Sequence, residues 1–266
     1  MGNGWKIIKK INKLPKLNNP ILIEGLPGIG NVGKVAVDFI IEELKAKKIF
    51  SFFSYSFPHS VFINENNLVE LPSIEIYYKA FNNKNMNDLL LLAGDIQPVD
   101  EVNSYEFSDK VLEVVEELNG KEIITLGGIG LPNIPKNPKV YCTGNDKKLI
   151  KEFDMVNTNL YGVIGPIVGV SGLLLGLAKK KKIPAVCLLA ETFNHPMYLG
   201  VKGAKQILKI LNKKLKLKIN FNELEKEISK IESEMLKKTK EFESVSKRLA
   251  LKKLKDRIGE EADYIG

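Results

Sequence analysis

The chain has 266 residues, of which 44% are hydrophobic and 27% are charged, and its formal net charge is +8. These values are typical of a globular protein with a substantial core, and they exclude a disordered or fibrous chain. With two histidines and two cysteines, a zinc site has almost nothing to build from, so we predict no metal site.

Short apolar runs alternate along the chain with segments of helical periodicity. Strands are predicted at residues 20–25, 49–54, 61–63, 73–81, 88–94, 121–128, 159–164 and 184–191. Helices are predicted at residues 31–44, 101–118, 170–178 and 202–217. This order predicts an α/β fold of three α/β/α layers around a mostly parallel central sheet, with a more antiparallel part between residues 49 and 81.

Residues 155–178 carry no charge and precede four lysines, which resembles a membrane span with a positive flank. Pro166 and five glycines interrupt the run, however, and Asn157 and Asn159 open it. We therefore predict a buried strand, a turn and a buried helix, and no membrane association.

Lysines are concentrated between residues 179 and 218, where eleven lysines and one acid give a local charge of +10. Such a surface attracts nucleic acid or an acidic protein. The chain has only two arginines, and no aromatic residues for base stacking lie among these lysines. We therefore expect a solvated helical surface and no nucleic-acid partner.

The last forty residues differ in pattern from the rest. Beyond Leu224, apolar residues recur at 228, 231, 235, 242, 245 and 249, which is a heptad-like seam on a long helix. We predict an α/β/α domain at residues 1–220, a helical appendage at 221–258 and a mobile tail at 259–266. The seam fits a helix that folds back on the domain or a helix that contacts another subunit. A helix that contacts another subunit predicts a homo-oligomer.

The segment GLPGIGNVGKV, residues 25–35, has the spacing of two nucleotide-binding motifs. A dinucleotide site needs an acid about 20 residues later, and none stands there. A P-loop needs Ser or Thr where Val35 stands, and Asp95 is the one candidate for its second carboxylate. Structural glycines and an anion site at the helix N-terminus remain alternatives. The residues of such an anion site are Gly28, Gly30, Asn31, Gly33 and Lys34.

Ser171, Glu191 and His195 follow in the chain order of a serine hydrolase. A nucleophile elbow needs glycine two residues on either side of the serine, and Leu173 stands where the second is needed. We therefore predict no catalytic residue in this trio.

Five short motifs carry a resemblance to a known family. They are GLPGIGNVGK (25–34), LLLLAGDIQP (89–98), ITLGGIG (124–130), GPIVGVSGLLLG (165–176) and CLLAET (187–192). In this order they resemble the archaeal proteasome assembly chaperone family. The resemblance implies a nucleoside-phosphorylase-like fold, a homo-oligomer without cofactor, and ATP-independent binding to proteasome α subunits in the cytoplasm. It leaves β subunits and a paralogous chaperone as further candidate partners.

The resemblance also implies a C-terminal tail of the pattern hydrophobic, tyrosine, any residue that docks on the α-ring. Here Tyr264 is third from the end instead of second, and Ile265 and Gly266 follow it. We expect these three residues to form the protein-binding tail, with a frayed terminus as the alternative.

A small-molecule enzyme of the nucleoside-phosphorylase type, or a nucleotide- or phosphate-binding protein, is the alternative function. In it the glycine loop would hold phosphate, and Asp95 or Glu191 would hold the base or ribose in a pocket at the strand ends.

Overall fold

The computed structural model describes residues 4–64, 66–81, 83–153, 165–196, 198–222 and 224–226. The chain divides into a compact unit that ends at Ile219 and a second unit that begins at Asn220. The heptad-like seam and the predicted tail fall outside the described residues, as does the predicted strand at 159–164. The division into three domains, with boundaries after residues 220 and 258, stays a prediction.

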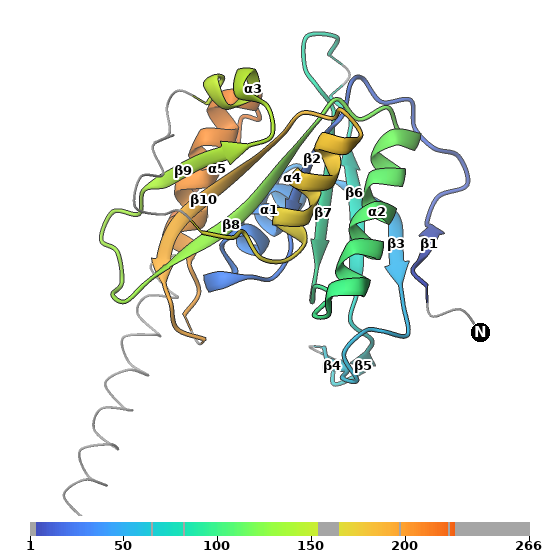
Figure 1. Cartoon of the computed structure of the whole chain (residues 1–266), viewed down its shortest axis with the longest axis horizontal. Helices are drawn as coiled ribbons and strands as arrows, with labels where there is room; N and C mark the ends of the chain where they lie inside the picture. Colours follow the sequence, from blue (N-terminus) through green and yellow to red (C-terminus); the bar gives the residue numbers. More distant parts are fainter. Residues whose placement is uncertain are drawn as a thin grey trace, which may run out of the picture. The chain divides into compact units, whose positions relative to one another are not determined.

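An eight-stranded sheet forms the middle layer of the first unit (Figure 1). Its order is β1 (Lys6–Lys9), β3 (Lys47–Phe53), β6 (Ile74–Lys79), β7 (Leu89–Gly94), β2 (Ile21–Gly25), β8 (Glu122–Leu131), β10 (Ala185–Phe193) and β9 (Val140–Gly144). Strands β7, β2, β8 and β10 are mutually parallel. Strand β6 is antiparallel to both β3 and β7, so β3 points in the same direction as β7. Five of the eight strands of this sheet therefore point one way.

Helices cover both faces of this sheet (Figure 1). On one face α1 (Val32–Glu43) packs against α5 (Val201–Leu215), and on the other α2 (Glu101–Glu117) packs against α4 (Val170–Lys180). A short helix, α3 (Lys147–Lys151), follows β9, and a 3-10 turn, η1 (Ile29–Asn31), precedes α1. The predicted three-layer fold class is therefore confirmed.

The central strands are buried on both faces, which explains their apolar sequences. All six residues of β7 and all five of β2 are buried. The helices present one apolar side to the sheet; in α5 it consists of Val201, Ala204, Ile207, Leu208 and Leu211. Within the described part of the chain, no helix is long and apolar enough to cross a membrane.

The lysine-rich segment is divided between two surfaces. Lys179 to Lys182 lie at the end of α4, while the later lysines lie on and after α5, on the opposite face of the sheet. Lys181 forms an ion pair with Glu116 of α2, and Lys214 forms one with Glu152. The segment therefore does not form the single basic surface that its sequence suggests.

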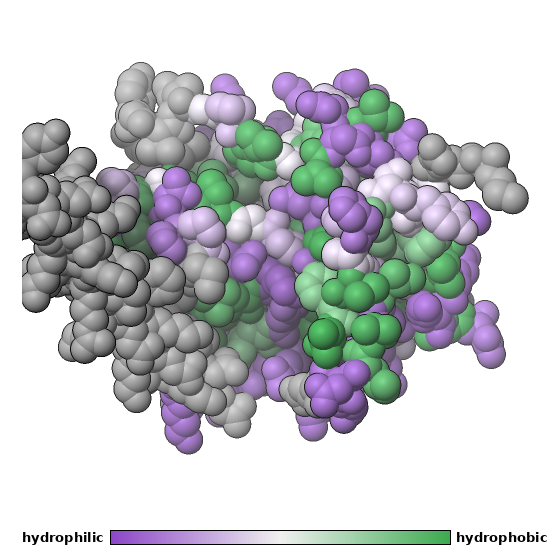
Figure 2. All heavy atoms as spheres, turned by 90° about the horizontal axis from the view of Figure 1, so that it is seen from below, coloured by the Kyte–Doolittle hydropathy of each residue, from purple (hydrophilic) through white to green (hydrophobic). Residues whose placement is uncertain are grey.

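A second, two-stranded sheet lies between β3 and β6 in the chain. It consists of β4 (Phe62–Ile63) and β5 (Val69–Glu70), paired antiparallel. Together with the antiparallel pair of β3 and β6, it forms the antiparallel part predicted between residues 49 and 81. Figure 1 places it at the lower end of the unit, and Figure 2 shows hydrophobic residues gathered on the right half of that end.

Candidate functional site at the carboxyl ends of the parallel strands

The glycine loop, residues 25–33, runs from the end of β2 into α1 and is closely packed. A Cβ on Gly33 would lie 2.5 Å from the carbonyl oxygen of Leu126 in β8, and one on Gly25 would overlap the carbonyl of Gly33. These glycines bring the first turn of α1 against β2 and β8. Gly28 differs, because its backbone is extended and a Cβ there would meet nothing within 4 Å.

The turn before α1 has two residues in the left-handed region, Gly30 with φ +61° and Asn31 with φ +50°. The Gly30 carbonyl accepts a 2.7 Å hydrogen bond from the Gly200 amide, which ties the loop to the start of α5. Thr192 of β10 is buried, and a Cβ on Gly30 would lie 2.5 Å from its Oγ1. The motif spacing is therefore explained by packing at three of its glycines.

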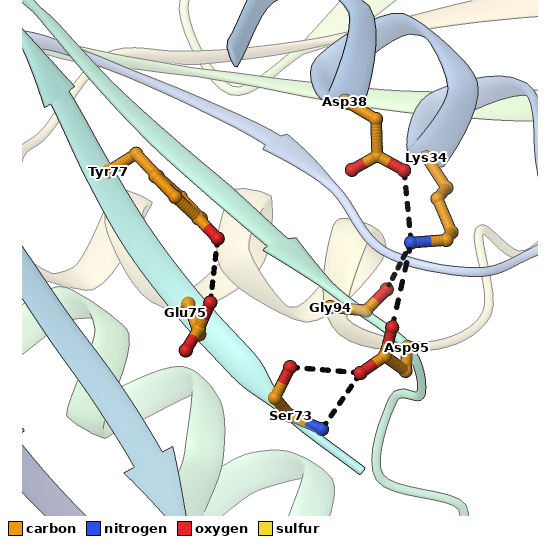
Figure 3. Close-up of polar contacts among 7 residues, drawn as sticks. All are labelled: Lys34, Asp38, Ser73, Glu75, Tyr77, Gly94 and Asp95. Carbon is orange, nitrogen blue, oxygen red and sulfur yellow. Dashed lines mark hydrogen bonds and ion pairs between the residues drawn. The ribbon is translucent and has the colours of Figure 1, made fainter. Parts of the chain in front are cut away.

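Lys34, the P-loop-like lysine, binds groups of the protein itself (Figure 3). Its Nζ donates to the Gly94 carbonyl at 3.0 Å, lies 3.0 Å from Oδ2 of Asp38 and lies 4.0 Å from Oδ1 of Asp95. Burial raises the pKa of the Asp38 carboxyl, and the Lys34 charge partly opposes that rise. Lys34 thus links α1 to the end of β7, with its charge balanced by two carboxylates.

Asp95, predicted as a pocket residue, joins the ends of two strands. Its Oδ2 accepts hydrogen bonds from the Ser73 amide at 3.0 Å and the Ser73 hydroxyl at 2.9 Å (Figure 3). Nearby on β6, Glu75 accepts from the Tyr77 hydroxyl at 2.7 Å and pairs with Lys48 at 2.6 Å. Burial, with the Glu75 contact, raises the pKa of Tyr77.

Glu191, the other predicted pocket residue, lies on β10 and binds the β9 side of the sheet. Its carboxylate accepts from the Lys139 amide at 2.9 Å and from the Tyr141 hydroxyl at 3.0 Å. Strands β2 and β8 lie between β7 and β10 in the sheet. At about 4.8 Å between neighbouring strands, β7 and β10 are roughly 14 Å apart. The structure therefore gives Asp95 and Glu191 different neighbours, and a pocket that both line stays a prediction.

Glu24 is the residue that sequence reasoning missed. It lies near the end of β2, is fully buried, and accepts hydrogen bonds from the Leu26 amide at 2.9 Å and the Ser171 hydroxyl at 2.8 Å. Burial raises its pKa from 4.5 to about 7, although these hydrogen bonds oppose the rise. The signal was present in the sequence: Glu24 is the one acid in an otherwise apolar strand.

Ser171 donates its hydroxyl proton to the carboxylate of Glu24, whereas the nucleophile of a serine hydrolase donates it to a histidine. The hydroxyl connects the first turn of α4 to β2 beneath the glycine loop.

Gln97 links three segments at the same edge. Its Nε2 donates to the Pro27 carbonyl at 2.6 Å, and its Oε1 accepts from the Val170 amide at 3.3 Å. The glycine loop, the loop after β7 and the start of α4 are thus held together.

Among the described residues, no group of three or more His, Cys, Asp or Glu side chains is placed to hold a metal ion. The arrangement suits a rigid scaffold in which Lys34, Gln97 and Ser171 bind other groups of the protein itself.

Proteins of similar sequence and structure are known. The chain is 31% identical over 261 residues to an uncharacterised protein of Methanocaldococcus jannaschii, covering 98% of this chain and 97% of the relative. The crystal structure of Pyrococcus furiosus PbaB, an archaeal proteasome activator, superposes with a TM-score of 0.81 and 34% identity, covering 90% of this chain and 100% of PbaB. The crystal structure of P. furiosus PbaA, an archaeal homolog of proteasome-assembly chaperone, superposes with a TM-score of 0.73 and 25% identity. The match covers 94% of this chain and 97% of PbaA.

The resemblance to archaeal proteasome assembly chaperones is thereby confirmed. The model of the PAC2 family matches residues 22–238, which is most of the chain. The chain belongs to the PAC2 family.

Proposed function

We propose that this protein is an ATP-independent assembly chaperone or activator of the proteasome, and that it binds subunits of the proteasome core without catalysing a reaction. The observation that carries the proposal is the match to PbaB, an archaeal proteasome activator, over the whole of PbaB and 90% of this chain. The match extends over the whole fold and is not limited to the glycine loop.

The geometry of the strand ends supports a binding protein over an enzyme. Lys34 binds Asp38 and the Gly94 carbonyl, and the Val35 side chain has no hydroxyl with which to bind magnesium. Close packing explains three glycines of the loop, Gly25, Gly30 and Gly33. A phosphate at the start of α1 would have to compete with Asp38 and Asp95 for the lysine, at a cost in electrostatic energy.

The proposed contact includes the tail, which lies outside the described residues. Tyr264 would supply an aromatic ring to a gap between two α subunits, Ile265 would fill the adjacent apolar wall, and the Gly266 carboxylate would bind a lysine there. We further propose that the protein acts in the cytoplasm as a homo-oligomer, with α subunits as its first partners and β subunits or a paralogous chaperone as additional ones.

The proposal is tested by incubating the untagged full chain with separately tagged α and β subunits, without nucleotide, and recovering the complexes. We expect recovery with α subunits. Absence of binding to either subunit, together with a clear thermal stabilisation by nucleosides, phosphate or ATP, would favour the small-molecule alternative.

A further inference from the structure

Exposed apolar residues gather at the end of the first unit where the parallel strands terminate. Part of this surface is one face of the hairpin formed by β4 and β5. Ile63 lies opposite Val69, and because side chains alternate along a strand, Val61 and Leu71 share their face. The exposed fractions of Val61, Ile63, Val69 and Leu71 are 52%, 72%, 68% and 66%. We call these four residues the hairpin face.

The start of α2 adds a second exposed apolar group. Val99 precedes the helix, and Val102 and Tyr105 lie on its first two turns, with exposed fractions of 84%, 66% and 51%. We call these three residues the α2 patch. Figure 1 shows the start of α2 and the hairpin at the same lower end of the unit, and Figure 2 shows hydrophobic residues gathered there. Exposed apolar residues are normally scattered, so two groups at one end mark an interaction surface.

Both groups come from acidic parts of the chain. Residues 49–78 and 85–109 hold nine acids and no lysine or arginine. At the average of the whole chain, which has forty basic residues in 266, these 55 residues would contain about eight. Because the net charge is +8, the rest of the chain carries +17. The apolar surface therefore lies in the acidic part of a basic protein.

Three carboxylates beside the apolar residues are free of ion pairs with the described residues. Glu70, Glu101 and Glu106 are all exposed, and Glu70 accepts a 2.6 Å hydrogen bond from the Asn64 side chain. On α2, Glu101 stands four residues before Tyr105, and Glu106 stands four residues after Val102. Residues four apart are neighbours on a helix, so acids and apolar side chains share one side of α2.

The charge decides which class of partner can cover this surface. Carboxylates repel the phosphates of nucleic acids and of anionic lipids. A second copy of the chain that met it through the same surface would place acids against acids. A polypeptide segment with apolar side chains and neighbouring lysine or arginine residues complements both properties. Its apolar atoms would leave water, and its cations would pair with the carboxylates at the border.

We propose that the hairpin face and the α2 patch form a docking surface for a basic, apolar polypeptide segment of a partner protein. The lysine or arginine residues of that segment pair with Glu70, Glu101 and Glu106. The inference goes beyond the proposed function, whose stated contact is the tail, and it holds or fails independently of tail docking.

The first test measures the binding of two synthetic peptides to the full wild-type chain by fluorescence anisotropy. One peptide consists of leucine and lysine in an amphipathic pattern, and the control has serine in place of every leucine. We expect the leucine–lysine peptide to bind about tenfold more tightly or better, because only it has apolar side chains to bury. Raising the salt concentration above about 0.1 M should weaken its binding, because salt screens the attraction to the carboxylates.

The second test locates the binding with two matched pairs of variants. Val69→Ser removes an apolar side chain from the hairpin face, and Ile134→Ser removes one, 53% exposed, from the loop after β8. Glu106→Lys reverses an exposed charge on α2, and Glu42→Lys reverses one on α1. We expect Val69→Ser to weaken binding of the leucine–lysine peptide by about tenfold and Glu106→Lys by about fivefold. The two controls should leave it unchanged. All four side chains are exposed, so circular dichroism should show the same fold in every variant.

Three results would overturn the proposal. The leucine–lysine peptide could fail to bind the wild-type chain, or could bind more tightly as salt is added. Its affinity could be the same for Val69→Ser and Glu106→Lys as for wild type, which would place its binding elsewhere. Finally, sedimentation could show that Val69→Ser dissociates an oligomer that Ile134→Ser leaves intact, which would assign the hairpin face to contact between copies of the chain.

Discussion

The Ser171 hydroxyl donates a 2.8 Å hydrogen bond to the carboxylate of Glu24 and so joins the first turn of α4 to the end of β2. The carboxylate is fully buried, and burial raises its pKa to about 7. Removing a charge from water is costly, so Glu24 binds a proton more readily in the folded protein than in the unfolded chain.

This difference makes stability depend on pH. Because the pKa of Glu24 is raised on folding from 4.5 to about 7, the folded state holds more protons between those values. The free energy of unfolding should therefore fall as pH rises from about 4.5 to 7, by about 3 kcal/mol from this group. In Glu24→Gln this contribution should vanish, because a carboxamide does not titrate.

The measurement is urea unfolding of both proteins at several pH values between 4.5 and 8. Other carboxylates titrate in both proteins, so the quantity to follow is the difference between wild type and Glu24→Gln. Parallel pH profiles would show that the buried carboxylate contributes nothing to the pH dependence.

The glycine loop offers a matched pair of substitutions. A Cβ on Gly33 would lie 2.5 Å from the Leu126 carbonyl, a backbone atom that cannot move aside, whereas a Cβ on Gly28 meets nothing within 4 Å. Gly33→Ala should therefore lower the free energy of unfolding by about 2 kcal/mol or more, and Gly28→Ala by less than about 0.5 kcal/mol. Equal losses in chemical denaturation would refute the packing explanation of the motif.

Lys34 allows a test of the nucleotide alternative. Because its Nζ binds Asp38 and the Gly94 carbonyl, and because Val35 cannot bind magnesium, we expect no Mg-ATP hydrolysis by the wild-type chain. Lys34→Ala should lower thermal stability, since it leaves the partly buried Asp38 without its cation. ATP turnover that disappears in Lys34→Ala would contradict this account.

Most of the fold could be predicted from the sequence, because buried central strands and amphipathic helices leave strong apolar patterns. Strands β2 and β7 and helices α1, α2 and α4 lie within a few residues of their predicted positions. The edge strand β1 was missed, since its sequence KIIK has two exposed lysines and no clear alternation. Helix α3 was missed because five residues are too few to show helical periodicity.

The contacts of the site could be predicted far less well. The sequence placed Lys34 and Asp95 after strands, and the structure brings them to within 4.0 Å of each other. The bond between Ser171 and Glu24 spans 147 residues, and nothing local to either residue indicates it. Such contacts depend on which strands become neighbours, and short sequence patterns do not encode that order.

The proposed tail gives a direct prediction about binding. Deleting residues 264–266 should weaken binding to proteasome α subunits by roughly thirty-fold or more, because loss of a buried aromatic anchor costs about 2 kcal/mol. Adding one residue after Gly266 should weaken it nearly as far, since the carboxylate would be displaced. Surface plasmon resonance with immobilised α subunits measures both, and sedimentation checks that the oligomer is intact. Unchanged affinity in both variants would assign the contact to the body of the protein.

The most direct measurement of the central claim is a binding isotherm of the full wild-type chain with assembled proteasome core particles, recorded with and without Mg-ATP. We predict saturable binding in the absence of nucleotide, with the same affinity when Mg-ATP is present. Absence of binding at concentrations where the protein is folded, or binding that requires Mg-ATP, would contradict the account.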